Sequence, residues 1–163
     1  MATEKETFLE TWEREFTTTL KVIKAYPADK LDLKPAEKSK SARDLLSVFI
    51  NEQHFFTQVL NGALDFSSVP PKSLATLDEI ASGTEKGNAT LVAKIKAMPD
   101  ASFEEKVNFP VAPKTMAPVR KMDLSWMMLM DSIHHRGQLS VYIRLAGGKV
   151  PSIYGPTADE PWM

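Results

Sequence analysis

Four long stretches of this 163-residue chain place an apolar residue at every third or fourth position, which is the spacing of one face of an α-helix. No stretch of similar length alternates polar and apolar residues as a strand does. Helices with one apolar face bury that face against one another. The pattern therefore predicts an all-α fold, a four-helix bundle, with helices from about Glu4 to Tyr26, Ser41 to Gly62, Thr76 to Pro99 and Val119 to Ala146.

Two of these stretches begin with helix-capping patterns. Ser41 precedes the second stretch, and Thr76 with Glu79 three residues later forms a capping box at the start of the third. Gly83 and Gly87 lie inside the third stretch, where each glycine costs about 1 kcal/mol relative to alanine. Either the helix breaks at these glycines or another backbone packs close to them.

The segments between the stretches are rich in proline and polar residues, which is typical of loops. After Gly147 and Gly148, the chain has little periodicity and is expected to form an extended tail that folds back on the bundle. Nothing indicates a second domain, so one domain is expected over 1–163. We expect a polar crossover over 27–40, a long crossover loop over 63–73 and an ordered loop, rather than a short strand, over 100–116.

Composition excludes several classes of function. The formal net charge is -1, so a nucleic-acid partner is not expected. No window approaches the roughly 18 apolar residues that span a bilayer, and the first residues are too polar for a signal peptide, so we expect a cytoplasmic protein without a membrane partner. The chain has no cysteine, which excludes disulfides, zinc–thiolate sites and cysteine nucleophiles.

The candidate site centres on three residues in the middle of the last helix, Asp131, His134 and His135. Asp131 and His135 are spaced i, i+4, so both side chains leave the same helix face and could hold a divalent metal. The same pair could instead hydrogen-bond to each other without a metal. We expect His135 to point into the bundle and His134 toward the edge of the bundle or the tail. Gln138, one turn beyond His135, could orient a ligand or a bound water.

A third metal ligand would have to come from the second helix, which offers Glu52 and His54. Two residues apart on a helix, these side chains point about 200° away from each other, so only one can face the site. An imidazole suits zinc, nickel or iron, whereas a carboxylate suits manganese or iron. Arg136 and Arg144 are predicted to be surface or interface charges, because a guanidinium is rarely buried unpaired.

The chain resembles the C-terminal part of DinB-family proteins. The resemblance is carried by His-His-Arg-Gly-Gln at 134–138, Tyr-x-Arg at 142–144 and Pro-x-x-Tyr-Gly-Pro at 151–156, and it is strongest over Met127 to Asp159. That superfamily includes YfiT-like metal-dependent hydrolases and the bacillithiol and mycothiol transferases. The resemblance implies a four-helix bundle that is commonly a homodimer, with a divalent metal held by one histidine of the second helix and two, spaced i, i+4, of the last.

Carried onto this chain, the last ligand of the family falls on His135, and its partner falls on Asp131, where many members have histidine. The position in the second helix falls on Val48. Glu52 lies one turn further along that face, and His54 is outside the usual register. The expected cofactor is therefore zinc, nickel or iron held by Asp131, His135 and either Glu52 or His54, or no metal at all.

Two hypotheses of function follow. The first is a metal-dependent enzyme that activates water or a low-molecular-weight thiol for attack on a small electrophile, as a hydrolase or thiol transferase with a small-molecule substrate. The second is a non-catalytic, metal-free dimeric bundle, a stress-related protein or a binding module. A third ligand facing Asp131 and His135 would distinguish the two.

Overall fold

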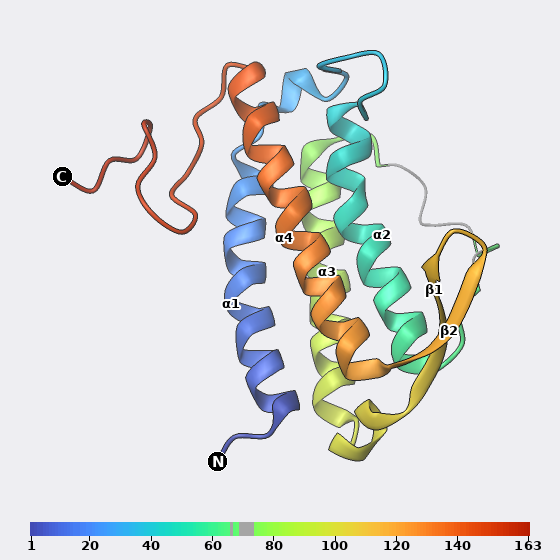
Figure 1. Cartoon of the computed structure of the whole chain (residues 1–163). Helices are drawn as coiled ribbons and strands as arrows, with labels where there is room; N and C mark the ends of the chain where they lie inside the picture. The colour runs from blue at the N-terminus through green and yellow to red at the C-terminus, as the bar shows by residue number, and fades with distance from the viewer. Residues whose placement is uncertain (66, 69–73) are drawn as a thin grey trace.

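The protein is described by a computed structural model, in which residues 1–65, 67–68 and 74–163 are placed. Over these described residues the chain forms four α-helices that lie side by side (Figure 1). None of these four is long and apolar enough to cross a membrane. The predicted four-helix bundle is confirmed, with α1 at Glu4–Lys24, α2 at Ala42–Asn61, α3 at Leu77–Ala97 and α4 at Lys121–Leu145.

The helices occupy the corners of a square in an order that differs from their order in the chain. α1 packs on α3 and α4, and α2 also packs on α3 and α4, so α1 and α2 lie at opposite corners. Arg43, at the start of α2, donates a hydrogen bond to the carbonyl of Leu74 just before α3, at 3.2 Å. α2 and α3 therefore begin at the same end of the bundle, and the connection between them joins opposite ends, as the predicted long crossover requires. That connection lies partly outside the described residues, because 66 and 69–73 are not described.

The capping residues read from the sequence fix the helix starts. The Ser41 hydroxyl accepts a hydrogen bond from the backbone N–H of Asp44 at 3.1 Å. Thr76 and Glu79 form a capping box, in which each side chain accepts from the other residue's backbone N–H. α2 ends at Gly62, whose φ of 78° lies in the left-handed region that glycine adopts without strain. These local contacts explain why the predicted boundaries of α2 and α3 hold.

α3 runs without a break through Gly83 and Gly87, and the space that a side chain would take there is filled from α2. A Cβ atom on Gly87 would lie 2.1 Å from Oε1 of Gln53, and one on Gly83 would lie 3.1 Å from Cδ1 of Ile50. The second of the two predicted alternatives, close packing, is therefore the observed one, but side chains rather than a backbone make the close approach.

The prediction of a loop over 100–116 was wrong in part, because the described chain pairs two antiparallel strands there, β1 (Lys106–Ala112) and β2 (Thr115–Arg120). Each strand of a two-stranded sheet is an edge, so a proline can lie with its missing N–H toward solvent. Val107 is buried against the bundle and anchors the hairpin. Two short 3₁₀ helices, η1 (Ala28–Lys30) and η2 (Asp100–Glu104), complete the described elements.

The interior consists of two apolar cores separated by a polar layer. The tail-side core includes Val22, Ile23, Tyr26, Leu45, Leu46, Phe49, Ile80, Leu139, Ile143 and Val150. The hairpin-side core includes Phe8, Trp12, Phe56, Val59, Leu91, Ile95, Phe103, Val107, Met122 and Leu129. Each helix places buried polar residues between the two sets, and this polar layer consists of Glu15, Thr19, Glu52, Gln53, Thr84 and Arg136. Ser47, Lys121 and Ser125 are also buried but lie outside this layer.

After α4 the chain forms the extended C-terminal tail that the sequence predicts, on the α1 side of the bundle (Figure 1). Two ion pairs tie the tail to the helices: Lys21 Nζ lies 2.8 Å from Glu160, and Arg144 Nη1 lies 2.9 Å from Asp159. Val150 is buried in the tail-side core. The tail is therefore attached to the bundle through both charged and apolar contacts.

Candidate metal centre

Three candidate ligands converge where the middles of α2 and α4 meet. Glu52 comes from α2, and Asp131 and His135 come from α4. Each offers one ligand atom, and these atoms all lie within 4.8 Å of one another. Nδ1 of His135 lies 2.6 Å from Oε1 of Glu52 and 3.8 Å from Oδ1 of Asp131. A carboxylate of α2 thus joins the i, i+4 pair of α4 that the sequence singles out.

Burial dominates the electrostatics of Glu52. This residue is only 8% exposed, and burial raises the pKa of its carboxyl to about 7, although the hydrogen bond and the charge of His135 act in the opposite direction. The nearby carboxylate of Asp131 raises the same pKa further. Two carboxylates this close repel each other, so a proton or a cation between them is favoured.

His135 shows the complementary effect. The hydrogen bond with Glu52 raises the pKa of the imidazole, and burial opposes this rise without cancelling it. Asp131 has a side chain that is 48% exposed, so the group of three is open to solvent on its side. Asp131 is therefore the most accessible of the three ligands.

The donor set fits a divalent metal. One imidazole and two carboxylates are ligands of zinc, iron and manganese in proteins. Tetrahedral ligand atoms held about 2.1 Å from one ion lie roughly 3.4 Å apart. Glu52 and His135 are closer than this and Asp131 is slightly farther, so small side-chain movements bring all three to that spacing. A cation would also neutralise the two carboxylates that repel each other.

The structure does not bring His54 to this group. Its Nε2 lies 2.9 Å from the side-chain amide of Gln58 and 3.2 Å from the hydroxyl of Ser68, on another face of α2. The angle of about 200° between residues two positions apart explains why Glu52 and His54 cannot both face α4. Of the two groups that the sequence left open, the structure places Glu52 beside Asp131 and His135.

His134 and Gln138 lie outside the group of three ligands, although the ring centroid of His134 is 5.4 Å from that of His135. His134 is exposed, as its helical position predicts, and its Nε2 lies 3.0 Å from the side-chain amide of Gln138, which is exposed too. His134 and Gln138 therefore contact each other on the surface of α4. The role of Gln138 in orienting a ligand stays a prediction.

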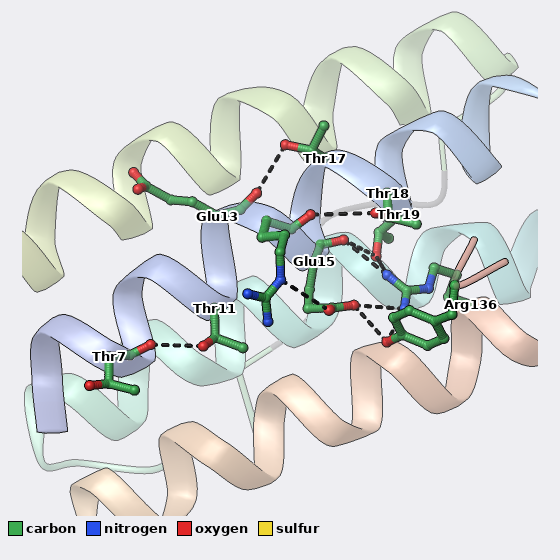
Figure 2. Close-up of polar contacts among 10 residues, drawn as sticks. Thr7, Thr11, Glu13, Glu15, Thr17, Thr18, Thr19 and Arg136 are labelled. Carbon is green, nitrogen blue, oxygen red and sulfur yellow. Dashed lines mark hydrogen bonds and ion pairs between the residues drawn. The ribbon is translucent and has the colours of Figure 1, made fainter. Parts of the chain in front are cut away.

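Next to the candidate ligands, Arg136 is fully buried, with 1% exposure, and the prediction that it is a surface or interface charge was wrong. Figure 2 shows its guanidinium pointing at Glu15 of α1. Nη2 donates to the Glu15 carboxylate at 2.7 Å, and Nη1 donates to the Glu15 carbonyl at 3.0 Å and to the Thr19 hydroxyl at 3.3 Å. Tyr154 of the tail completes the network: its hydroxyl accepts from Arg136 and donates to Glu15 at 2.7 Å.

A signal for this network was present in the sequence. An apolar face read from the sequence of the first helix would pass through Phe16, but Glu15 is buried and Phe16 is only half-buried. The series Phe8, Trp12, Glu15, Thr19 and Val22 keeps the three- and four-residue steps equally well and is the buried face. A search for apolar residues alone therefore misses Glu15, a polar residue on the buried face of α1.

Comparisons with known proteins agree with this fold. A model of the DinB family matches residues 1–162. The YrdA protein of Bacillus subtilis, described as uncharacterized, is 32% identical over 76 residues, which are 47% of this chain and 42% of YrdA. The chain thus matches less than half the length of this curated relative.

Solved structures show the same architecture at low sequence identity. A DinB-like protein of Bacillus cereus is 20% identical with a TM-score of 0.77, over 90% of this chain and 95% of that one. The DinB-like protein YjoA of Bacillus subtilis is 21% identical with a TM-score of 0.73, over 90% of this chain and 97% of that one. A variant of mycothiol-dependent maleylpyruvate isomerase is 12% identical with a TM-score of 0.63, over 85% and 63%. The family match covers nearly the whole chain, and the chain therefore belongs to the DinB family.

Proposed function

We propose that the chain is a metal-dependent enzyme, a hydrolase or thiol transferase, that acts on a small electrophilic molecule. The observation that carries this proposal is the convergence of Glu52, Asp131 and His135 within 4.8 Å, from two helices, with Glu52 buried. A buried carboxylate beside a second carboxylate costs folding free energy unless a cation or proton offsets it. The arrangement is thus better suited to holding an ion than to stabilising the bundle.

Each residue has a defined part in the proposed site. Glu52 and His135 bind from the interior, and Asp131 binds from the solvent side, where a water or a thiol can approach. A bound divalent ion would lower the pKa of that water or thiol and so supply the nucleophile at neutral pH. Zinc, nickel or iron is the expected metal, and the second carboxylate adds manganese to the ions that a test should include.

A low-molecular-weight thiol as co-substrate has support from fold alone. The maleylpyruvate isomerase with a similar fold is described as mycothiol-dependent. At 12% identity this likeness does not carry over residue roles. We therefore keep water and a thiol as the two nucleophiles to test.

One observation favours the alternative, a metal-free, non-catalytic bundle. His135 and Glu52 already form a 2.6 Å hydrogen bond with each other, so neither buried group lacks a partner. In that case one shared proton takes the place of the ion, and the pair contributes only to the packing of α2 on α4.

Metal content decides between the two. We expect wild-type protein, purified without added metal or loaded afterwards with zinc, nickel, iron or manganese, to bind about one ion per chain. Glu52→Gln, Asp131→Asn and His135→Gln should each weaken binding at least about tenfold. Binding should also weaken as pH falls toward about 6, because a ligating imidazole must be neutral. Elemental analysis and metal titration of the purified variants provide the measurement.

His54→Gln and His134→Gln are the matched controls, since neither imidazole belongs to the group of three candidate ligands. They should bind metal as wild type does. A loss in the controls equal to that in His135→Gln would place the site elsewhere. Wild type that holds no ion after loading would leave the metal-free bundle as the function to pursue.

We also propose that the protein is a homodimer, as the family resemblance implies. The end of α4 and the tail expose several large apolar side chains that a second copy could cover, namely Leu145, Tyr154 and Trp162. In such a dimer each copy would keep its own candidate site, because Glu52 and His135 come from α2 and α4 of the same chain.

A further inference from the structure

A groove lies between the start of α2 and the end of α4, on the side of the bundle that carries the candidate metal centre. Its volume is about 440 Å³, within the size range of small-molecule sites. Its lining is half polar and half apolar and includes Lys38, Ser39, Lys40, Leu45, Gln138 and Tyr142. The segment before α2 thus forms one wall of the groove, and the last turns of α4 form the other.

The groove is close to the three candidate ligands. Tyr142 lies seven positions beyond His135 on α4, and Leu45 lies seven positions before Glu52 on α2. Seven residues are two helical turns, so both groove residues share a face with the ligand on their helix and lie about 10 Å from it along the axis. A molecule that extends from the groove to the ligands would therefore have to span about 10 Å.

The groove carries unpaired positive charge. Lys38 and Lys40 are exposed, and within the described ranges neither ammonium has an acidic partner. The hydroxyl of Tyr142 donates to the carbonyl of Lys40 at 3.0 Å, which fixes the backbone of this lysine to α4.

We propose that this groove binds the acidic end of a small organic anion, with Lys40 and Lys38 as its counter-charges. Binding of the acidic end does not depend on the proposed function. Only the second part of the inference rests on that function, namely that the other end of the anion is the electrophile that reacts at Glu52, Asp131 and His135. The substrate class is therefore a carboxylate- or phosphate-bearing electrophile, in which about 10 Å or less separates the acidic group from the reacting atom.

The test uses succinate as a charged probe and succinamide as its neutral counterpart. Both are titrated into the full-length protein, metal-free and zinc-loaded, and binding is followed through backbone amide NMR shifts. Succinate should shift the resonances around Lys40 and Tyr142. Succinamide should bind at least about fivefold more weakly than succinate. The double variant Lys38→Gln/Lys40→Gln should weaken succinate binding by at least about fivefold.

The matched control is Lys34→Gln/Lys86→Gln, which removes the same charge from two exposed lysines outside the groove. It should bind succinate within about twofold of wild type, because neither lysine lines the groove. Unshifted amide spectra away from the groove will show that both double variants fold. Equal weakening in the two double variants, equal binding of succinamide or no binding of succinate to wild type would overturn the proposal.

The two proposals fail separately. If the protein binds no metal but binds succinate through Lys38 and Lys40, the groove stands and the metal-dependent function fails. If the protein binds metal and no succinate in either form, the function stands and the anion site fails.

Discussion

Arg136 is a fully buried cation that pairs with a buried carboxylate, that of Glu15. Its guanidinium is surrounded by Glu15, Thr19 and Tyr154, and its centre lies 4.9 Å from the centroid of the tyrosine ring. Burial by itself raises the pKa of Glu15, but hydrogen bonds from Tyr154 and Arg136 and the charge of the arginine outweigh burial and hold the pKa below its ordinary value of 4.5. A buried charge pair of this kind is costly to break, because the remaining charge has no partner.

Arg136→Met should therefore destabilise the protein by about 3 kcal/mol, since it removes the buried cation of Glu15 and leaves only the exposed Arg14, at 3.8 Å, to offset the carboxylate. Arg144→Met is the control on the same helix. Arg144 pairs with Asp159 at 2.9 Å but is about half exposed, so its loss should cost less than about 1 kcal/mol. Denaturant unfolding at neutral pH measures both, and similar losses would contradict the assignment.

The same pair predicts a pH dependence. The carboxyl of Glu15 binds a proton less readily in the folded than in the unfolded state, so its contribution is complete above about pH 4.5 and is lost as the pH falls further. Wild type should lose stability on this acid side, and Arg136→Met should lose less, because burial alone raises the pKa of Glu15. Equal acid-side slopes in the two proteins would show that other carboxyls dominate.

At the scale of the elements, the packing of α3 on α2 depends on Gly87, although glycine has a low helix propensity. Gly87 leaves room for Gln53 of α2, whose amide donates to the Thr84 carbonyl at 3.1 Å while its Oε1 is buried. The helical propensity lost at the glycine is offset by the close approach of α2. The packing of α2 against position 87, rather than helix propensity, thus explains why this residue is glycine.

Gly87→Ala should for this reason destabilise the protein by about 1 kcal/mol, although alanine favours helix by about that amount. The new Cβ would displace Gln53 and break its bond to Thr84. Gly137→Ala, in α4, is the control: no described atom lies within 4 Å of its added Cβ, so it should stabilise by up to about 1 kcal/mol. Thermal and denaturant unfolding of the two variants give opposite signs, and stabilisation in both would refute the packing argument.

Elements set by local contacts could be predicted from the sequence, and contacts between elements could not. Helical periodicity and the caps at Ser41 and Thr76 depend on neighbours within a few residues, so α2 and α3 were predicted within a residue or two. Strand pairing joins Lys106 to Arg120, and prolines in both strands hide it. The choice between Glu52 and His54 required the orientation of α2 against α4, which periodicity alone does not fix.

At the scale of the whole molecule, the polar layer divides the bundle into two cores of different composition. Aromatic rings are concentrated in the hairpin-side core, where Phe8 and Phe56 meet edge to face at 5.9 Å. The tail-side core is mainly aliphatic and adjoins the groove. The two sets form separate apolar clusters within the described chain, and the polar layer lies between them.

Substitutions in the two cores should accordingly be additive. Ile80→Val in the tail-side core and Ile95→Val in the hairpin-side core should each cost about 0.5–1.5 kcal/mol, and the double variant should equal their sum within about 0.5 kcal/mol. Phe8→Leu and Phe56→Leu, whose rings touch, should deviate from additivity by more than that. The measurement is the unfolding free energy of the four single and two double variants. Strong coupling between Ile80 and Ile95 would contradict the division of the bundle into two cores.

The polar layer also bears on how such a chain can change over generations. A helix that slid by one turn, about 5.4 Å, would separate Arg136 from Glu15, so every alignment of α1 with α4 except the present one is penalised. Because that alignment is held at one level of the bundle, apolar side chains at either end can be exchanged for others of similar volume without shifting the helices. Descendants of this chain can therefore remodel the end that carries the groove while inheriting the hairpin end unaltered.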